Sequence, residues 1–336
     1  MIQNNVNLLD LNTFGIGVLA KHFSRFESVE KLKLLLENQS KEEILILGGG
    51  SNILFTKDFN GIVLKNEIKG FKTIEEHKDD VVVESGAGEN WHEFVLKCID
   101  NNFCGLENLS LIPGSVGASP MQNIGAYGVE IKDVFEKLSA YHIPSGEIHE
   151  FNHSQCEFGY RESVFKRKLK GQYVILNVSF RLSKKSKINS SYGAIESELK
   201  KMRIINPSIK DISNAVIAIR SSKLPNPKLI GNAGSFFKNP VVDRMILNEI
   251  QKKYEDVPFY ATDHDDKVKL PAGWLIEKAG WKGKTFEHYG VHKMQALVLV
   301  NYGNANGNEI LELSNQIIND INQKFGVTLE REVNIL

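Results

Sequence analysis

The segment from Gly231 to Pro240 combines residue types that could transfer a proton. It reads Gly-Asn-Ala-Gly-Ser-Phe-Phe-Lys-Asn-Pro and places the hydroxyl of Ser235 between two glycines and two phenylalanines. Glycine permits a tight turn or the close approach of a ligand. Phe236 and Phe237 can exclude water, which strengthens the polar interactions of neighbouring groups. The pattern makes Ser235 a candidate catalytic residue, although taken alone it also fits a turn that enters a strand.

A run of glycines follows a predicted strand at 44–47. Gly48-Gly49-Gly50-Ser51-Asn52 does not match the dinucleotide fingerprint, because its third glycine would fall at Ile53 and no helical pattern follows. What remains is a row of backbone N–H groups with no side chains in the way, an arrangement that binds phosphate. A flexible hairpin loop explains the run equally well.

The segment 105–128 is long, rich in small residues and nearly free of charge. A surface loop of this length is normally charged and mobile, so we expect this one to pack around a ligand. Its N–H groups suit a pyrophosphate, and its apolar side chains suit a ring system. Together with 48–52, it predicts a dinucleotide bound in an extended pose.

Arg161 stands among aromatic residues in Phe158-Gly159-Tyr160-Arg161-Glu162-Ser163-Val164-Phe165. A guanidinium in such a setting stays charged and can bind a carboxylate through two parallel hydrogen bonds. An ordinary structural salt bridge, for example with Glu162, is the alternative.

Periodicity predicts the elements that must position these segments, in a mixed order that indicates an α+β fold. Helices are expected at 28–37, 91–99, 191–203 (headed by Tyr192), 212–220, 241–253, 272–279 and 308–324. Strands are expected at 44–47, 53–55, 62–64, 81–83, 134–142, 173–182, 235–238, 296–300 and 327–336. Ser221 to Pro227, with two prolines, is a candidate linker.

Composition narrows the class of protein. The 336 residues suffice for two or three domains, and equal numbers of basic and acidic residues, 41 each, leave no net charge to attract nucleic acid or anionic membrane. The three cysteines lack the spacing of metal ligands and are expected to be reduced thiols. We find no secretory signal and no apolar run of membrane-spanning length. We therefore expect a cytoplasmic, soluble protein without a metal site.

The chain resembles the UDP-N-acetylenolpyruvoylglucosamine reductase family over nearly its whole length. Each motif alone is weak, but their joint occurrence in family order is specific. Ser191-Tyr192-Gly193 resembles the longer subtype, in which a tyrosine-bearing loop covers the substrate. The motifs that carry the resemblance are Gly48 to Asn52, Ile112 to Ala118, Gln122 to Gly128, Tyr160-Arg161, Gly231 to Pro240 and Glu332.

The resemblance implies a vanillyl-alcohol-oxidase-type FAD-binding fold in two lobes plus an α+β substrate-binding domain. The expected domains are lobe 1 at 1–66, lobe 2 at 67–220 and the substrate domain at 221–326, with 327–336 returning to the FAD and substrate site. It also implies noncovalent FAD, which NADPH reduces before leaving. UDP-N-acetylglucosamine enolpyruvate is then reduced to UDP-N-acetylmuramate, a peptidoglycan precursor. We expect a monomer.

The resemblance also implies residue roles. Flavin N5 would deliver hydride to C3 of the enolpyruvyl double bond, and Ser235 would give a proton to C2. Arg161 would bind the carboxylate and stabilise the developing enolate, and Glu332 would hold or polarise the enol form. The matched cofactor-binding residues are Gly48, Gly49, Gly50, Ser51, Asn52, Pro113, Gly114, Gly117, Ala118, Ser119, Gly125 and Ala126. The matched substrate-binding residues are Tyr127, Tyr192, Lys223, Asn239 and Gln295.

Two features near the C-terminus depart from the family pattern. Arg331 precedes Glu332 where the motif has proline, and the chain reaches Leu336 soon after. A frayed end would loosen the carboxylate of Glu332. Glu330 is a second acidic candidate, because strand alternation would place it on the same face as Glu332.

Two other functions remain open at the level of sequence. An FAD-linked oxidase or dehydrogenase of the same fold, acting on another hydroxyl substrate, would share the glycine clusters but would not need Ser235, Arg161 and Tyr192 together. Rapid oxygen-driven turnover with an alcohol would favour it. A non-enzymatic nucleotide-binding protein would have no reason to combine Arg161, Ser235 and Glu332.

Overall fold

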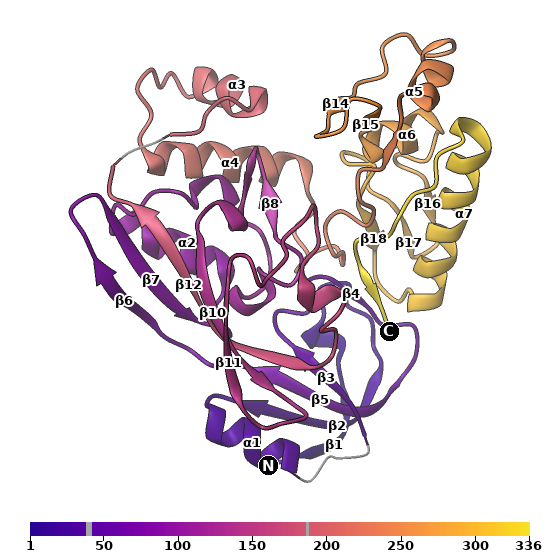
Figure 1. Ribbon diagram of the computed structural model, residues 1–336. Helices are drawn as coiled ribbons and strands as arrows, with labels where there is room; N and C mark the ends of the chain where they lie inside the picture. Colours follow the sequence, from indigo (N-terminus) through magenta and orange to yellow (C-terminus); the bar gives the residue numbers. More distant parts are fainter. Residues whose placement is uncertain (38–41, 186–187) are drawn as a thin grey trace. The chain divides into compact units, whose positions relative to one another are not determined.

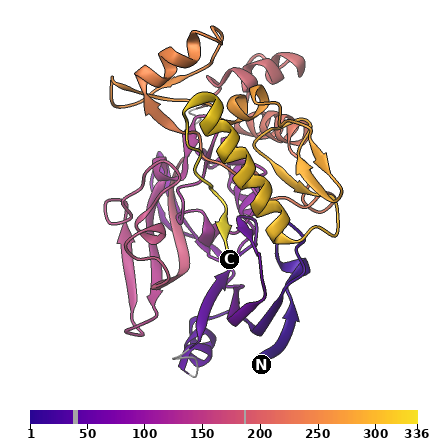
Figure 2. The same cartoon turned by 90° about the vertical axis from the view of Figure 1, so that its right-hand side faces the viewer.

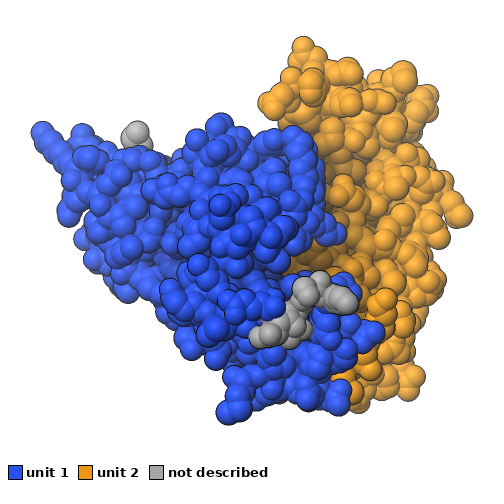
Figure 3. All heavy atoms as spheres, turned by 60° about the horizontal axis from the view of Figure 1, so that its bottom comes forward, with its two compact units in different colours: residues 1–6, 20–50, 59–222 blue, residues 7–19, 51–58, 223–336 orange. Residues whose placement is uncertain are grey.

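A computed structural model describes residues 1–37, 42–185 and 188–336 (Figure 1). The chain forms two compact units, coloured separately in Figure 3. The first unit comprises residues 1–6, 20–50 and 59–222, and the second comprises 7–19, 51–58 and 223–336. The finer division of the first two hundred or so residues into two lobes stays a prediction.

The first unit contains a four-stranded sheet built around β5. Its order is β1 (Gln3–Asn7), β2 (Leu19–Phe26), β5 (Phe59–Asn66) and β3 (Glu43–Leu47). Both β2 and β3 pair with β5 in parallel, and β5 is buried along most of its length, as expected for a central parallel strand. Helix α1 (Val29–Glu37) buries Leu32 and Leu35 against Ile62 and Leu64 of β5. The predicted helix at 28–37 and the strands at 44–47 and 62–64 are confirmed.

A five-stranded antiparallel sheet forms the larger part of this unit. Its order is β11 (Ile148–Asn152), β10 (Phe135–His142), β12 (Tyr173–Ser183), β7 (Asp80–Gly86) and β6 (Phe71–Glu76). Helix α2 (Trp91–Asp100) begins at the cap of Asn90, whose side chain accepts from the N–H of Glu93. Its aromatic residues pack on the sheet, with the Phe94 and Phe180 ring centroids 5.2 Å apart. The predicted elements at 81–83, 91–99, 134–142 and 173–182 are confirmed.

The last part of the first unit is helical. Helices α3 (Gly193–Lys201) and α4 (Ile209–Lys223) share a core that includes Ile195, Leu199, Ile212 and Val216. As predicted, Tyr192 occupies the position before α3. The short strands β8 (Gly125–Ala126) and β9 (Val129–Glu130) form an antiparallel pair in the segment 105–130.

The second unit combines small sheets with three helices. Its strands are β13 (Val241–Asp243), β15 (Lys267–Lys269) and β14 (Tyr260–Ala261); β16 (Thr285–Phe286), β17 (Tyr289–Val291) and β18 (Leu299–Asn301); and the parallel pair β4 (Ile53–Leu54) and β19 (Asn334–Ile335). Its helices are α5 (Arg244–Gln251), α6 (Ala272–Lys278) and α7 (Gly307–Phe325). Asn306 and Glu309 form a capping box at the start of α7, and Gly326 ends it in the left-handed conformation at φ 66°.

Four predicted elements of the second unit need correction. The segment 235–238 is not a strand, because only Phe237 forms an isolated bridge, with Arg331. The predicted helix at 241–253 begins only at Arg244, since 241–243 pairs as β13. The strand expected at 296–300 is β18, shifted toward the C-terminus, and the strand expected at 327–336 is regular only in β19.

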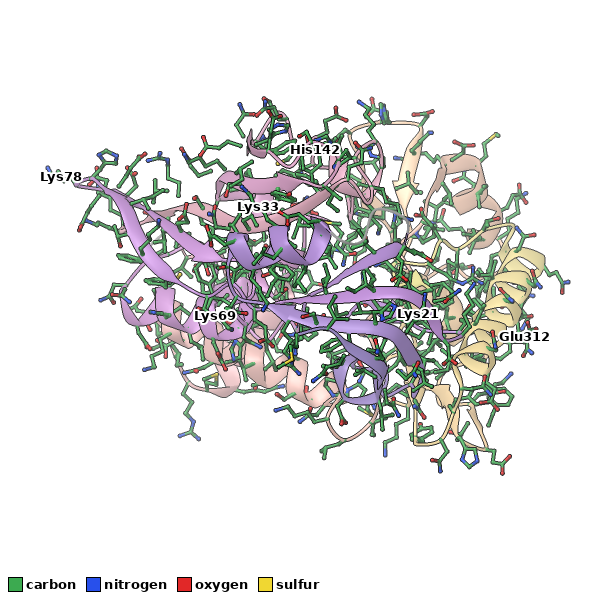
Figure 4. All side chains as sticks on the ribbon, turned by 90° about the horizontal axis from the view of Figure 1, so that it is seen from below. Lys21, Lys33, Lys69, Lys78, His142 and Glu312 are labelled. Carbon is green, nitrogen blue, oxygen red and sulfur yellow. The ribbon has the colours of Figure 1, made fainter. Side chains whose placement is uncertain are left out.

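Most charged side chains lie at the surface, as for Lys21, Lys33 and Lys69 in Figure 4. Glu107 and Lys238 are exceptions, with exposed fractions of 2% and 6%. Charged groups are rarely buried unless they are paired or hydrogen-bonded, so these two positions mark places where the fold makes specific use of charge. Among the described helices, none has both the length and the apolar character needed to cross a membrane.

Candidate active site

In the first unit, the two predicted glycine segments pack directly against each other. A Cβ added at Gly49 would lie 2.8 Å from the Cα of Gly114, and one added at Gly48 would lie 2.4 Å from the Oγ of Ser115. No hydrogen bond within the described residues uses the N–H groups of Gly114 and Ser115. The two turns therefore form one backbone surface on which N–H groups remain available for an anionic ligand.

Helix α2 and the turn before it hold this surface in place. The N–H of Trp91 donates to the carbonyl of Gly114 at 3.0 Å. A Cβ added at Gly117 would lie 2.5 Å from the Cβ of Ala87, so Gly117 is needed for close packing between backbones. The two glycines thus have different roles: Gly114 is part of the surface with available N–H groups, and Gly117 allows the close packing behind that surface.

The other predicted cofactor-binding residues lie along the same two turns or just beyond them. Gly50 is buried with φ 61°, a conformation that glycine adopts easily. The hydroxyl of Ser119 is used inside the protein, donating to the carbonyl of Val116 at 2.7 Å. Pro113 and Ala118 are exposed, while Gly125 and Ala126 form β8.

Several residues near these turns hold a backbone conformation that is unusual for side chains other than glycine. Leu111, Asn123, Tyr127 and Arg161 have φ of 60°, 44°, 51° and 56°. Such strain persists only where the surrounding structure enforces it, and it concentrates at functional sites. This observation agrees with the predicted importance of 105–128 and Arg161.

Arg161 is anchored to the strand pair that follows the glycine-rich segment. Its Nη2 donates to the carbonyl of Gly125 at 2.6 Å, and its Nη1 lies 3.5 Å from Oε1 of Glu130. Its guanidinium also lies 5.1 Å from the centroid of the Tyr160 ring. These contacts hold a half-buried guanidinium in a fixed orientation, which suits recognition of a carboxylate.

Tyr127 and Tyr192, both predicted to bind substrate, meet edge to face with ring centroids 5.4 Å apart. Burial raises the pKa of the Tyr127 hydroxyl, and the positive charge and hydrogen bond of Arg220 oppose that rise. The Nε of Arg220 also donates to the carbonyl of Leu111 at 3.2 Å. Burial, followed by the charge of Arg220, lowers the pKa of His92.

Arg220 was missed by the sequence analysis, although it connects Tyr127 with the strained residue Leu111. Its only signal in the sequence was its position on α4 close to Lys223. The contact between Arg220 and Tyr127 depends on tertiary packing between residues 93 positions apart in the chain, which periodicity does not report.

In the second unit, Ser235 lies between a glycine turn and buried aromatic residues. Gly234 has φ 70°, and a Cβ added at Gly231 would lie 2.1 Å from the carbonyl oxygen of Phe14. Gly231 therefore permits close approach of the protein's own backbone. Phe236 is fully buried beside Phe14, with ring centroids 6.1 Å apart. The described residues offer the half-buried hydroxyl of Ser235 no hydrogen-bond partner, so this hydroxyl has no structural task within the unit.

Glu332 is held against the same segment. Its N–H donates to the carbonyl of Phe236 at 2.8 Å, and the side chain of Asn52 donates to the carbonyl of Glu332 at 3.2 Å. The residues after it pair with β4, where the N–H of Leu336 donates to the carbonyl of Leu54 at 2.9 Å. Residues 334–336 are therefore part of a sheet, and the backbone of Glu332 is not loosened by a frayed end.

Glu330, the second acidic candidate, forms an ion pair with the buried amine of Lys238. A buried ammonium needs a partner, so Glu330 has a structural task that favours Glu332 as the functional acid. Glu330 and Glu332 were expected on the same face of a regular strand. No regular strand forms there, because 330–332 pairs only through the Phe237–Arg331 bridge.

Asn239 and Gln295 gather at the first turn of α6. The side-chain oxygen of Asn239 accepts from the N–H of Ala272 at 2.9 Å. A Cβ added at Gly273 would lie 3.3 Å from Oε1 of Gln295, and the carbonyl of Leu297 accepts from Phe236 N–H at 2.8 Å. These contacts bring Gln295 to the segment that carries Ser235.

The predicted site residues thus fall into two groups. Ser235, Glu332, Asn239 and Gln295 come together in the second unit, with Ser51 and Asn52 at its β4 segment. The glycine segments, Arg161, Tyr127 and Tyr192 belong to the first unit. Lys223 is exposed at the end of α4. Among the residues that the structure describes, no cluster of His, Cys, Asp and Glu could hold a metal ion.

Comparisons with known proteins bear on both groups. The family model "UDP-N-acetylenolpyruvoylglucosamine reductase, C-terminal domain" matches residues 225–336, and the model "FAD binding domain" matches 20–152. The chain is 53% identical to the UDP-N-acetylenolpyruvoylglucosamine reductase of Flavobacterium johnsoniae, over 100% of this chain and 99% of that protein. The reductase of Amoebophilus asiaticus is 50% identical over 100% and 99% of the two chains.

The chain belongs to the UDP-N-acetylenolpyruvoylglucosamine reductase family.

The predicted fold, cofactor and activity are those of this reductase family. The protein is an FAD-dependent, NADPH-using oxidoreductase of peptidoglycan precursor synthesis. The crystal structure of the reductase from Thermus caldophilus shows the same fold, with a TM-score of 0.70 at 22% identity over 100% of this chain and 98% of that chain. The structure of p-cresol methylhydroxylase shares the fold more distantly, with a TM-score of 0.50 at 11% identity over 96% and 83% of the two chains.

The first unit fits the FAD that the family requires. The contact between Gly49 and Gly114 leaves a side-chain-free surface with available N–H groups, which suits a pyrophosphate. The FAD-binding model covers 20–152, which includes both glycine segments. The sequence left a flexible hairpin loop open for 48–52, and the close backbone packing against 114–115 argues against that alternative.

Proposed function

We propose that Ser235 donates the proton that completes reduction of the enolpyruvyl double bond. Its hydroxyl has no hydrogen-bond partner among the described residues, and it stands next to the fully buried Phe236. A hydroxyl is a weak acid in water, so it protonates only a strongly basic carbon in a water-poor, preorganised setting. The single observation that carries the proposal is this uncommitted hydroxyl within a segment that is otherwise fixed by hydrogen bonds.

Arg161 and Glu332 would stabilise the charge that develops before that proton arrives. Negative charge forms at C2 and spreads into the adjacent carboxylate when hydride reaches C3. The guanidinium of Arg161, already oriented by Gly125 and Glu130, would bind this carboxylate and favour the enolate. Glu332, whose backbone is fixed to Phe236, would hold or polarise the enol form.

The cofactor would be held by backbone groups of the first unit. When held there, FAD would supply the hydride chemistry that links NADPH to the alkene. The N–H groups of Gly114 and Ser115, with the turn at 48–50, would bind the diphosphate, and no covalent attachment is needed. Preorganised amides bind an anion at little additional cost in conformational entropy.

The remaining predicted residues would bind the nucleotide-sugar part of the substrate. Lys223 is an exposed point charge suited to phosphate. Tyr192, with an exposed fraction of 43%, packs edge to face against Tyr127 and would close over the substrate, as in the longer subtype. Asn239 and Gln295 would contact the diphosphate and sugar from the start of α6.

We also propose that the enzyme is a cytoplasmic monomer with the predicted boundaries of 1–66, 67–220 and 221–326. Cys98, Cys104 and Cys156 are buried thiols, as is usual in a reducing compartment. The match of separate family models to 20–152 and 225–336 supports a boundary near residue 221. Light scattering of the purified enzyme tests the oligomeric state.

Separate measurement of the two half-reactions tests the role of Ser235. In anaerobic stopped-flow experiments, Ser235→Ala should be reduced by NADPH at nearly the wild-type rate. Reoxidation of the reduced variant by UDP-N-acetylglucosamine enolpyruvate should slow by about 10²- to 10⁴-fold, the range expected for loss of a positioned proton donor. Reoxidation at the wild-type rate would show that another group supplies the proton.

A further inference from the structure

Arg331 lies between two residues whose backbones are tied to the segment that carries Ser235. The carbonyl of Glu330 accepts from Lys238 N–H at 2.9 Å, and Glu332 N–H donates to the carbonyl of Phe236 at 2.8 Å. These two bonds flank the bridge between Phe237 and Arg331. In such a pair, the N–H of Arg331 takes no part in the pairing. The backbone at 331 is thus held only through its neighbours.

The side chain of Arg331 adds a third attachment, to helix α7. Its Nε donates to Oγ of Ser314 at 2.8 Å, and its Nη2 donates to the side-chain oxygen of Asn315. Ser314 is fully buried and its own hydroxyl donates to the carbonyl of Leu311 at 2.6 Å. Figure 2 shows the segment after α7 returning beside this helix.

Helix α7 is a firm base for this attachment. It extends over 19 residues, is capped at both ends, and buries Ile310, Leu313 and Ile317 in the core of the second unit. A guanidinium presents several donors in a rigid plane, so two bonds to adjacent residues fix it more firmly than the single point charge of lysine would. The position of the helix is therefore transmitted to the backbone immediately before Glu332.

We propose that Arg331 is a positioning residue that ties the 330–332 segment to α7 and thereby orients Glu332 for reduction of the substrate. This inference rests on the proposed role of Glu332. A small displacement of a catalytic group can slow a reaction by about 10²-fold. The hydrogen bonds of Arg331 to α7 therefore affect the rate even though Arg331 does not contact substrate. Arg331 is outside the residues proposed above to contact substrate or cofactor.

The test measures reoxidation of the reduced enzyme by UDP-N-acetylglucosamine enolpyruvate for Arg331→Ala, Glu332→Gln and the double variant. Arg331→Ala should slow this step by about 10-fold or more, with reduction by NADPH changed less than about twofold. In the Glu332→Gln background, the same substitution should cause little further slowing, because residues that act through one another are not additive. A purely structural role would slow both half-reactions, or would act equally in both backgrounds, and would overturn the proposal.

Arg331→Lys provides a second variant should the alanine variant fold poorly. Lysine keeps the charge but cannot bond Ser314 and Asn315 through one planar group, so Arg331→Lys should slow reoxidation nearly as much as Arg331→Ala. Arg244→Ala is a matched control, because Arg244 also bonds a carbonyl of its own unit, that of Asp265 at 3.2 Å, but is exposed on α5. Its rate of reoxidation should equal that of the wild type.

The controls separate two kinds of failure. If Glu332→Gln reoxidises at the wild-type rate, the proposed role of Glu332 is wrong and the present inference falls with it. If Glu332→Gln is slow while Arg331→Ala and Arg331→Lys are both fast, the role of Glu332 stands and only the positioning by Arg331 is refuted.

Discussion

The two groups of site residues are built by different means. In the first unit, the surface at 48–50 and 114–115 consists of backbone, and its shape depends on glycines that let two turns touch. In the second unit, Ser235 and Glu332 contribute side chains, and hydrogen bonds from neighbouring segments fix the backbone beneath them. The first arrangement suits binding of a phosphate-bearing cofactor, and the second suits proton transfer.

This difference determines which substitutions each group tolerates. A backbone surface survives the loss of most side chains but not the addition of one at a contact glycine. A reacting side chain is lost on truncation to alanine, although the fold around it remains. Damage to the two groups should therefore appear in different measurements: cofactor occupancy for the first and the rate of substrate reduction for the second.

The largest effect on cofactor binding is expected for Gly49→Val. Its Cβ would lie 2.8 Å from the Cα of Gly114, and because this neighbour is a backbone atom rather than the end of a flexible side chain, the two turns must separate. We expect FAD affinity to fall by about 10²-fold or more, or about 2.7 kcal/mol. The ratio of flavin to protein absorbance after purification measures this loss.

Gly17→Ala is the matched control for that variant. A Cβ at this position would make only ordinary contacts, the nearest at 3.8 Å to Asn7 and Leu9 side chains. Its flavin content should equal that of the wild type. Full flavin content in Gly49→Val would mean that contact between the two turns is not needed for cofactor binding.

A smaller effect is expected for Arg161→Lys, in the second half-reaction only. Lysine keeps the positive charge but cannot hold Gly125, Glu130 and a substrate carboxylate with one planar fork. Loss of a charge-assisted hydrogen bond weakens binding by about 1.5–3 kcal/mol, so reoxidation by substrate should slow by roughly 10- to 100-fold. Stopped-flow absorbance of the flavin follows both steps.

Arg167→Lys controls for a change of cation in the same loop. Arg167 is exposed and its Nε lies 3.7 Å from Oε2 of Glu162. This substitution should leave both half-reactions unchanged. Equal slowing in the two variants would point to a general disturbance of the loop and would remove Arg161 from the proposed site.

The smallest effect concerns the stability of the first unit. Glu107 is buried at the start of the 105–128 segment, where its Oε2 accepts from Gly105 N–H at 2.7 Å. Burial raises the pKa of Glu107 above its ordinary value of 4.5. The folded protein therefore binds the proton more tightly than the unfolded chain, and this stabilisation, complete below pH 4.5, is lost as pH rises through the raised pKa.

Glu107→Gln removes this titration and keeps an acceptor for Gly105. Relative to wild type, the variant should gain free energy of unfolding as pH rises from 4 to 8, on the order of 1 kcal/mol. Urea denaturation at several pH values measures the difference. Glu312→Gln, a substitution at an exposed position of α7, is the control (Figure 4). If the difference in free energy of unfolding between Glu107→Gln and wild type stayed constant from pH 4 to 8, the raised pKa of Glu107 would be contradicted.

Local patterns in the sequence were sufficient to predict elements with strong periodicity and clear ends. Helix α2 was expected at 91–99 and is found at Trp91–Asp100, where five apolar residues repeat at helical spacing after the Asn90 cap. Helix α7 was expected at 308–324 and is found at Gly307–Phe325, between a capping box and Gly326. In both cases, the residues that determine where the helix begins and ends lie within the helix or next to it.

Features that depend on distant partners could not be predicted in this way. The segment 235–238 has strand-like residues, but it finds only the Phe237–Arg331 bridge, since its partner is a single short stretch near the C-terminus. The contact between Gly49 and Gly114 and the interaction between Arg220 and Tyr127 likewise join residues far apart in sequence. The glycine segments were found by composition, and the resemblance to a family, rather than periodicity, supplied the roles of Ser235, Arg161 and Glu332.

The most direct test of whether cofactor binding and proton transfer are separate functions is the dissociation constant of FAD. It is measured by quenching of flavin fluorescence for the apo forms of wild type, Ser235→Ala and Gly49→Val. We predict that Ser235→Ala binds FAD within about twofold of wild type, while Gly49→Val binds about 10²-fold more weakly. Equal weakening in the two variants would contradict the account, because it would mean that the backbone surface and the reacting hydroxyl do not serve separate functions.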